Sequence, residues 1–156
     1  HFRLGTINEH QRLFSNRISI MMIKGFVCGV FDMYHAGHVM MLKECRENCD
    51  YLIVAINEAE NIDTKINPGK KLPLYSIKER VMIMGSCKYV DKVLTYNSED
   101  ELLALMKKYS PDIRFLGDDY REKKITGSEL NIRIHYTDRS HGLSTSKYKR
   151  RLMNEN

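Results

Sequence analysis

The chain has 156 residues, of which 42% are hydrophobic and 29% are charged, a balance typical of a single soluble globular domain. No apolar run reaches the roughly 20 residues that span a bilayer, so we expect a cytoplasmic protein without membrane contact. The net charge of +5 fits an anionic partner. Since the sequence shows neither zinc-finger spacing nor a basic stripe with interleaved aromatic residues, it favours a small anionic substrate over nucleic acid.

The first 21 residues differ in pattern from the rest of the chain. They are mixed and polar, without a clean period, and Met21-Met22-Ile23 then leads into an apolar segment as the start of a natural chain would. They also lack the long apolar stretch of a signal peptide. We interpret residues 1–21 as an expression remnant or a non-core extension, and residues 22–156 as a single domain.

Strand and helix signals alternate from residue 22 onward. Residues 25–30 and 51–56 are short apolar runs, as expected of parallel strands covered on both faces. Between them, the apolar residues of segment 39–49 recur at helical spacing. Residues 57–73 contain two prolines and a glycine, which predicts a long loop, and loops of this length are often functional.

The second half of the chain continues the alternation. Ser76 with Glu79, and Ser98 with Glu101, are capping-box patterns that mark two helix starts. The alternation predicts an α/β fold, with a Rossmann-like, doubly wound parallel sheet of about five strands whose ligands bind at the carboxyl ends of the strands. The further helices are expected at 76–87, 98–109 and 144–153, and the further strands at 90–94, 113–116 and 132–136.

The strongest functional signal is the sequence GVFDMYHAGH at residues 29–38, between the first strand and the first helix. A helix N-terminus offers unpaired N–H groups and a positive dipole end, which suit a phosphate. Gly29 and Gly37 allow the backbone to approach a ligand closely. His35 and His38 are three residues apart, so both imidazoles can face one side and donate to phosphate oxygens during phosphoryl transfer.

A metal pair is the rival interpretation of these two histidines. It lacks a third ligand at typical spacing, and the four cysteines do not form the paired C-x-x-C pattern of a zinc or redox site. We therefore expect reduced thiols and no protein-bound metal.

A second phosphate site is expected at the start of the last helix. Ser144 and Thr145 follow Gly142 there, and one of the two hydroxyls should cap the helix. The same helix end can bind phosphate, with Arg139 reaching a triphosphate. Two such helix ends facing one cleft would hold a polyanion between them.

These residues resemble the nucleotidyltransferase superfamily with the H-x-G-H signature. From residue 24 to residue 151 they are similar, more narrowly, to the cytidylyltransferases that act on glycerol 3-phosphate, phosphocholine and phosphoethanolamine. The similarity is carried by residues 29–38, 50–56, 88–93 (KYVDKV, against R-Y-V-D-E-V), 117–120 (GDDY, against G-D-D-W) and 139–146 (RSHGLSTS, against R-T-x-G-I-S-T-[TS]). The last motif narrows the resemblance toward CTP.

The resemblance implies an enzyme that transfers CMP from CTP to a phosphorylated small alcohol and releases pyrophosphate, with Mg²⁺ carried by the triphosphate. It also implies a homodimer with residues 88–93 near the interface. Adenylyltransferases share the H-x-G-H motif, so an enzyme that uses ATP on a sugar phosphate, pantetheine phosphate or flavin is the alternative. A nucleotide-sensing or nucleic-acid-binding module without turnover is the third possibility.

The resemblance also assigns roles to individual residues. Lys65 in the long loop would be catalytic with His35 and His38, although Lys70 or Lys71 could take its place, and Lys65 and Arg80 would contact the acceptor. Arg80 could equally be a structural salt-bridge partner. Two departures concern other contacts: Val30 replaces a threonine near the phosphates, and Lys88 replaces an arginine and so loses a bidentate contact. Glu99 and Leu102 stand where the glycerol-phosphate enzymes carry an aromatic residue and a lysine toward the acceptor, which leaves the acceptor open. The nucleotide would contact Gly29, Val30, Phe31, His35, Gly37, His38, Asp119, Arg139, Ser140, Gly142, Leu143, Ser144 and Thr145.

Overall fold

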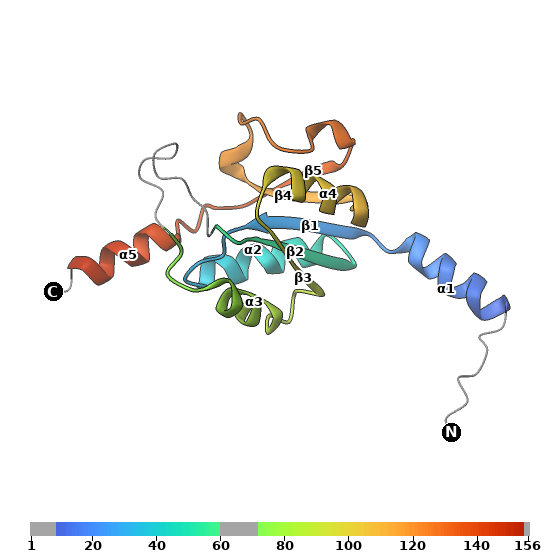
Figure 1. The fold of residues 1–156 in the computed structure, drawn as a ribbon, viewed down its shortest axis with the longest axis horizontal. Helices are drawn as coiled ribbons and strands as arrows, with labels where there is room; N and C mark the ends of the chain where they lie inside the picture. The colour runs from blue at the N-terminus through green and yellow to red at the C-terminus, as the bar shows by residue number, and fades with distance from the viewer. Residues whose placement is uncertain (1–8, 60–71, 155–156) are drawn as a thin grey trace, which may run out of the picture.

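A computed structural model describes residues 9–59 and 72–154 of the chain. Its centre is one sheet of parallel strands in the order β3-β2-β1-β4-β5 (Figure 1). This confirms the predicted doubly wound, Rossmann-like α/β fold. The strands are β1 (Lys24–Gly29), β2 (Tyr51–Asn57), β3 (Lys92–Tyr96), β4 (Ile113–Gly117) and β5 (Arg133–Thr137). The helices are α1 (Glu9–Met21), α2 (Ala36–Glu47), α3 (Ile77–Gly85), α4 (Glu99–Tyr109) and α5 (Thr145–Asn154), with short 3₁₀ turns η1 (Asp118–Tyr120) and η2 (Ser128–Leu130).

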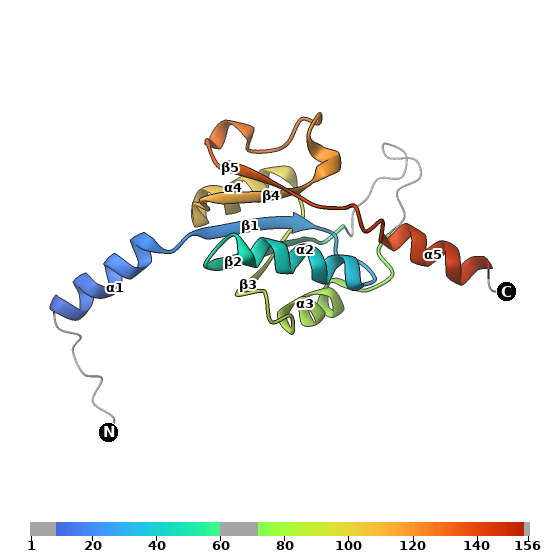
Figure 2. The ribbon, with the colours of Figure 1, turned by 180° about the vertical axis from the view of Figure 1, so that it is seen from behind.

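Helices cover both faces of the sheet, because successive side chains of a strand point to opposite sides. On β2, Leu52, Val54 and Ile56 pack with α2 and α3, whereas Ile53 and Ala55 pack with α4. Figures 1 and 2 show α4 on one side of the strands and the pair α2 and α3 on the other. The continuous apolar run that predicted β2 therefore contributes side chains to two hydrophobic cores, one on each face of the sheet.

The capping patterns differ in how fully they form. Ser76 and Glu79 make the complete box at the start of α3, with reciprocal hydrogen bonds of 3.3 Å and 2.8 Å. At α4, the Ser98 hydroxyl accepts from Glu101 N, but the Glu101 carboxylate accepts from Asn97 N instead of Ser98 N. The second box was therefore wrong in half of its pattern, although α4 begins where it was expected.

Residues 9–21 form α1, which the sequence pattern did not predict. The helix projects from the sheet (Figures 1 and 2), and Leu13 and Phe14 on it are 61% and 69% exposed. A helix of mixed composition without an apolar stripe shows no 3.6-residue period of apolar side chains, so the sequence does not indicate it. That residues 1–21 lie outside the core domain stays a prediction. Within the described ranges, no helix has the length and apolar character to cross a membrane.

Candidate active site

Two histidines shape the turn between β1 and α2. His35 is the N-cap of α2, and its Nδ1 accepts a hydrogen bond of 3.0 Å from Gly37 N. The Nδ1 of His38 in turn accepts one of 3.3 Å from His35 N. A Cβ on Gly37 would lie 2.8 Å from Cε1 of His35 and 3.1 Å from Cβ of Leu143, so this position requires glycine. The two imidazoles thus form a capping box in which histidines replace the usual hydroxyl and carboxylate.

This geometry fixes the protonation of both rings. Burial lowers the pKa of His35, helped by the nearby His141 and Arg139. Burial, together with His35 and Arg139, lowers the pKa of His38 to about 4. Both rings are therefore neutral at pH 7. Because Nδ1 accepts in each, the proton resides on Nε2, which gives each ring one N–H donor for a ligand oxygen.

Asp32 joins three segments at the same turn. Its buried carboxylate accepts hydrogen bonds of 2.9 Å from Leu74 N, 3.0 Å from Tyr75 N and 3.1 Å from Lys149 Nζ. Burial alone would raise the pKa of Asp32, but these hydrogen bonds and the charge of Lys149 outweigh it, so the pKa is lowered and the group stays ionised. Lys149 lies on α5, so Asp32 holds the last helix against the first turn.

The backbone around Asp32 is strained. Phe31 and Met33, on either side of it, have φ values of 53° and 47°. The left-handed region costs an L-residue about 1–2 kcal/mol. Conformations of this kind persist where surrounding contacts over-determine them, and they gather at ligand-binding turns.

The start of α5 meets the same turn. Thr145 Oγ1 donates a 3.1 Å hydrogen bond to the carbonyl of Asp32, and Ser144 Oγ accepts from Lys147 N at 3.3 Å. Ser144 therefore caps α5, while Thr145 ties the helix to the turn after β1. Ahead of them, His141 Nδ1 accepts from Leu143 N at 3.0 Å, and Gly142 supplies a φ of 65°. The N-termini of α2 and α5 consequently converge.

A cleft of about 320 Å³ lies between these helix ends. Asp119 and Ser140 lie beside it, around a second hollow, and Asp119 Oδ1 accepts from Arg139 Nη1 at 2.8 Å. Gly142 shapes the turn before α5. Lys65, the predicted catalytic lysine, falls outside the described residues. Of the residues predicted to bind nucleotide, the cleft brings together Gly29, Val30, Phe31, His35, Gly37, His38, Arg139, Leu143, Ser144 and Thr145.

Arg80 lies in a different setting from the one expected of an acceptor contact. It is 2% exposed, and its guanidinium donates to the carbonyls of Tyr75, Val30, Asn57 and Glu58 at 2.6–3.0 Å. These carbonyls belong to three separate segments around the site. The geometry supports a structural role, in which Arg80 ties the ends of β1 and β2 to the start of α3.

Sequence reasoning gave no role to several residues of the cleft. His141 is the most notable, because it repeats the bond made by His35: its Nδ1 accepts from the amide two residues ahead. A histidine beside Gly142 in the last motif was the available signal. The cleft also includes Cys28, Met41, Gly117, Tyr120 and Ser146.

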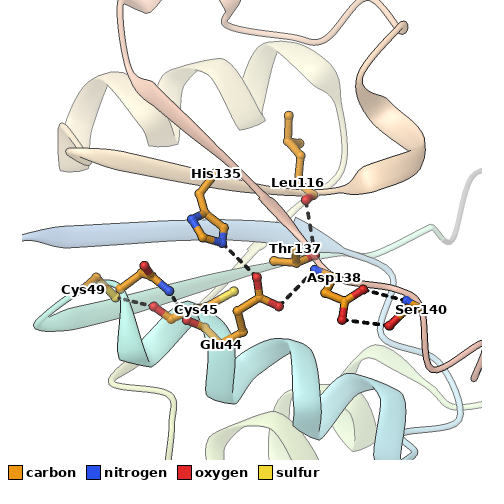
Figure 3. A network of polar contacts seen from close by, with 9 residues as sticks. Glu44, Cys45, Cys49, Leu116, His135, Thr137, Asp138 and Ser140 are labelled. Carbon is orange, nitrogen blue, oxygen red and sulfur yellow. Dashed lines mark hydrogen bonds and ion pairs between the residues drawn. The ribbon is translucent and has the colours of Figure 1, made fainter.

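Glu44 on α2 positions the loop that carries Arg139 (Figure 3). Its Oε1 lies 2.8 Å from His135 Nε2, and its Oε2 accepts from Asp138 N at 3.0 Å. Asp138 then accepts from the amide and hydroxyl of Ser140 at 2.8 Å and 2.9 Å. The network connects α2, β5 and the loop before α5.

Replacing Glu44 with glutamine should raise the KM for the nucleotide about fivefold and leave kcat within about twofold. The substitution removes roughly 1 kcal/mol of charge-assisted hydrogen bonding. The loop is then held less firmly, but Glu44 does not contact the reacting atoms. Steady-state kinetics and the melting temperature measure this. Glu47→Gln is the control, since Glu47 makes an exposed pair with Lys43 at 3.8 Å on the same helix. Equal effects of the two variants would refute the positioning role.

Metal ligation has little support in this geometry. Residues 9–59 and 72–154 contain no group of three or more histidine, cysteine, aspartate or glutamate side chains that could hold an ion. The cleft lining among these residues includes imidazoles, hydroxyls and an arginine, but no carboxylate of the kind that Mg²⁺ prefers. The four cysteines are free thiols in the structure.

The strands of the sheet are parallel, and an H-x-G-H turn and a second helix N-terminus meet at their carboxyl ends. These features define the class of nucleotidyltransferase-like proteins. The family model described as cytidylyltransferase-like matches residues 26–151. The chain therefore belongs to the cytidylyltransferase-like family, within the nucleotidyltransferase superfamily.

Curated relatives carry the name Bifunctional protein HldE. The one from Campylobacter concisus is 31% identical over 150 residues, which cover 96% of this chain and 31% of the relative. One from Helicobacter pylori is 36% identical over 121 residues, or 78% of this chain and 26% of the relative. The chain thus spans about a third or less of the length of these relatives.

Two solved structures share the fold. A lipopolysaccharide core biosynthesis protein from Thermoplasma volcanium superposes with a TM-score of 0.58 and 28% identity, covering 75% of this chain and 99% of that one. Pantoate-beta-alanine ligase from Francisella tularensis, solved with beta-gamma ATP and beta-alanine, gives a TM-score of 0.53 at 18% identity, with 90% and 70% covered. The ligase supports the fold alone.

Proposed function

We propose that the protein transfers CMP from CTP to a phosphorylated small alcohol and releases pyrophosphate. The observation that carries this proposal is the convergence of the α2 and α5 N-termini, with two neutral imidazoles, on one cleft. Backbone N–H groups and dipole ends from two helices supply positive potential to a triphosphate without requiring a P-loop.

In the proposed reaction, an oxygen of the acceptor phosphate attacks the α-phosphorus of the nucleotide in line. The new O–P bond forms as the bond from the α-phosphorus to the bridging oxygen breaks, and pyrophosphate leaves with that oxygen's electron pair. No covalent enzyme intermediate is required. His35 and His38 donate from Nε2 to the phosphate oxygens that gain charge. Arg139 and the N-terminus of α5 hold the β and γ phosphates.

Other parts of the proposal rest on the family resemblance. Lys65 would neutralise the α-phosphate or the acceptor. Mg²⁺ would arrive with the triphosphate and keep phosphate and water as its ligands, since the described lining of the cleft has no carboxylate to offer. A homodimer with Lys88–Val93 near its interface is part of the same proposal, and light scattering of the purified chain measures it.

The two candidate enzymes differ in the nucleotide that they use. The H-x-G-H turn is shared with adenylyltransferases, which makes ATP the second candidate, whereas the R-x-x-G-[IL]-S-T pattern at residues 139–145 favours CTP. Pyrophosphate release should be measured with each nucleotide against glycerol 3-phosphate, phosphocholine, phosphoethanolamine and a sugar phosphate. Thermal shifts with CTP and ATP report the preferred nucleotide independently, because a bound ligand stabilises the native state by mass action.

We expect release with CTP to exceed release with ATP for at least one acceptor. A larger rate and thermal shift with ATP would assign the adenylyltransferase function. A folded protein that binds nucleotide but releases no pyrophosphate with any pair would instead be a sensing module.

A further inference from the structure

Four aromatic side chains form a chain of ring contacts through the active site. The ring centroids of His35 and His38 are 4.0 Å apart, and their planes are inclined by 32°. His38 also stacks with Tyr34, at 5.7 Å and 5°. His35 meets Tyr148, at 5.1 Å and 38°. Both imidazoles that are proposed to donate to phosphate therefore contact a tyrosine ring, at separations usual for aromatic pairs.

The two tyrosines come from different parts of the chain. Tyr34 belongs to the same turn as the histidines, so its contact is local. Tyr148 lies on α5, the helix whose N-terminus is proposed to hold the β and γ phosphates, and it is half-buried. Neither tyrosine is among the described residues that line the cleft, whereas both histidines are. Tyr148 therefore contacts His35 from outside the cleft, and its influence on the reacting atoms passes through that ring.

The position of Tyr148 is fixed by the way α5 is held. Thr145 Oγ1 donates to the carbonyl of Asp32, and Lys149 Nζ donates to its carboxylate, both at 3.1 Å. Tyr148 is four residues after Ser144, which caps the helix, and Tyr148 N donates to the Ser144 carbonyl at 3.2 Å. Residues four apart lie one above the other on a helix. The ring that contacts His35 is thus one helical turn from the amides proposed to bind phosphate.

The His35 ring needs such a contact to keep its direction. Its Nδ1 accepts one hydrogen bond, from Gly37 N at 3.0 Å. A single bond at one edge selects the tautomer but leaves the ring able to tilt about that bond. Misplacing a reacting group by about 1 Å can slow a reaction by about 10²-fold, so functional side chains are held by the packing of their neighbours. Tyr148 and His38 provide this packing for His35.

We propose that Tyr148 is a positioning residue that holds the His35 imidazole with its Nε2–H directed into the cleft. This inference rests on the proposed transfer reaction, in which His35 donates to a phosphate oxygen. It adds that α5 provides both a phosphate site and the packing that directs the donor, so one helix aligns the triphosphate with His35. Loss of the ring should therefore reduce turnover more than nucleotide binding.

Two substitutions separate the ring of Tyr148 from its hydroxyl. The contact joins two rings, so Tyr148→Phe should keep kcat within about twofold of the wild type, whereas Tyr148→Leu should lower it about tenfold. The nucleotide KM should stay within about twofold in both variants, because the bonds from α5 to Asp32 remain. Circular dichroism verifies folding, and Tyr148→Met takes the place of Tyr148→Leu if the latter does not fold.

Tyr109→Leu is the matched control. Tyr109 is also a half-buried tyrosine on a helix, but its carbonyl accepts from Lys24 Nζ at 2.7 Å, beside the first residue of β1. It therefore lies at the amino ends of the strands, away from the cleft, and the control should change neither kcat nor the nucleotide KM. A Tyr148→Phe variant as slow as Tyr148→Leu would overturn the proposal, and so would a nucleotide KM that rises as far as kcat falls.

A double-mutant cycle tests whether Tyr148 acts through His35. His35→Asn keeps a capping oxygen for Gly37 N but has no Nε2. In that background, Tyr148→Leu should change kcat by less than about twofold, because the donor that it directs is already absent. A further tenfold loss would show that the two residues act independently, and the positioning role would then be wrong.

NMR of the ¹⁵N-labelled imidazoles provides a readout that does not need turnover. The spectra distinguish the two neutral tautomers, and His35→Asn identifies the His35 signals by their loss. The wild type should show the proton of His35 on Nε2, and Tyr148→Phe should retain that pattern. Tyr148→Leu should move the signals toward averaged values, because a ring that turns loses its bond to Gly37 N part of the time.

These spectra decide the inference alone if the wild type releases no pyrophosphate with any pair, or if His35→Asn is too slow to measure. In the first case the transfer reaction fails by itself. Averaged His35 signals in Tyr148→Leu would still establish that Tyr148 holds the ring. Signals identical to those of the wild type would overturn it.

Discussion

Replacing His38 with alanine should lower kcat by about 10²–10³-fold while the protein still folds. The expected loss follows from the Nε2–H of a neutral, partly buried imidazole at a helix N-terminus, since removing one preorganised donor from a developing charge costs about this much. Pyrophosphate release under saturating substrate measures kcat, and circular dichroism verifies the fold. The nucleotide KM should change less than kcat, because the donor acts most strongly in the transition state.

A second variant separates catalysis from structure at this position. His38 Nδ1 also accepts from His35 N at 3.3 Å, so alanine removes an N-terminal capping bond as well as a donor. Asparagine can replace that acceptor through its side-chain oxygen but has no group at the place of Nε2. His38→Asn should therefore be as slow as His38→Ala and more stable. His10→Ala, on exposed α1, is the control, and near-normal turnover of His38→Asn would end the catalytic assignment.

The same variants test the pKa of His38. In the unfolded chain the imidazole takes up a proton near its ordinary value of 6.5, whereas burial lowers the pKa in the folded protein to about 4. Between these values the unfolded state binds more protons, so stability falls as the pH falls from about 6.5 toward 4. The melting temperature of the wild type should drop across this window, and that of His38→Asn should drop less.

Local patterns predicted the elements of this fold well, and the reason is visible in β2. Its run of apolar residues needs cover on both faces, and alternate members pack with helices on opposite sides of the sheet. The two turns proposed to bind phosphate were also predictable locally, because a helix end with a glycine and hydroxyl or imidazole side chains carries its chemistry within a few residues.

Such local patterns do not identify the partners of a side chain that lie far away in the sequence. Arg80 donates to carbonyls as many as 50 positions away, and backbone carbonyls are present at every residue, so sequence gives no sign of which ones it binds. Arg114 interrupts an apolar strand, but that its buried Nε has no hydrogen-bond partner among the described residues is a property of the packed core. Asp32 was likewise assigned no role in the chemistry, and its partner Lys149 lies 117 positions away.

Replacing Asp32 with alanine should lower the free energy of unfolding by about 3 kcal/mol, the largest stability effect expected in the site. Leu74 N and Tyr75 N would lose their acceptor, and a hydrogen bond to a charged group contributes about 1.5–3 kcal/mol. Urea denaturation measures the change as a lower midpoint with an unchanged slope. Asp100→Ala, an exposed first-turn position on α4, is the control and should cost only a few tenths of a kcal/mol.

The Asp32 variant should also weaken nucleotide binding, and the reason links the fold to the proposed chemistry. Lys149 would lose its anchor, and Phe31 and Met33 would be free to leave their left-handed conformations. The turn that gives Thr145 its carbonyl partner would then relax, and α5 would no longer be held beside α2. We expect the nucleotide KM to rise tenfold or more, about 1.4 kcal/mol.

Asp32→Asn keeps one acceptor oxygen and should fall between the wild type and Asp32→Ala in both measurements. Wild-type nucleotide affinity in a destabilised Asp32→Ala would show that the two helix ends bind phosphate independently, and that their convergence is not what holds the nucleotide.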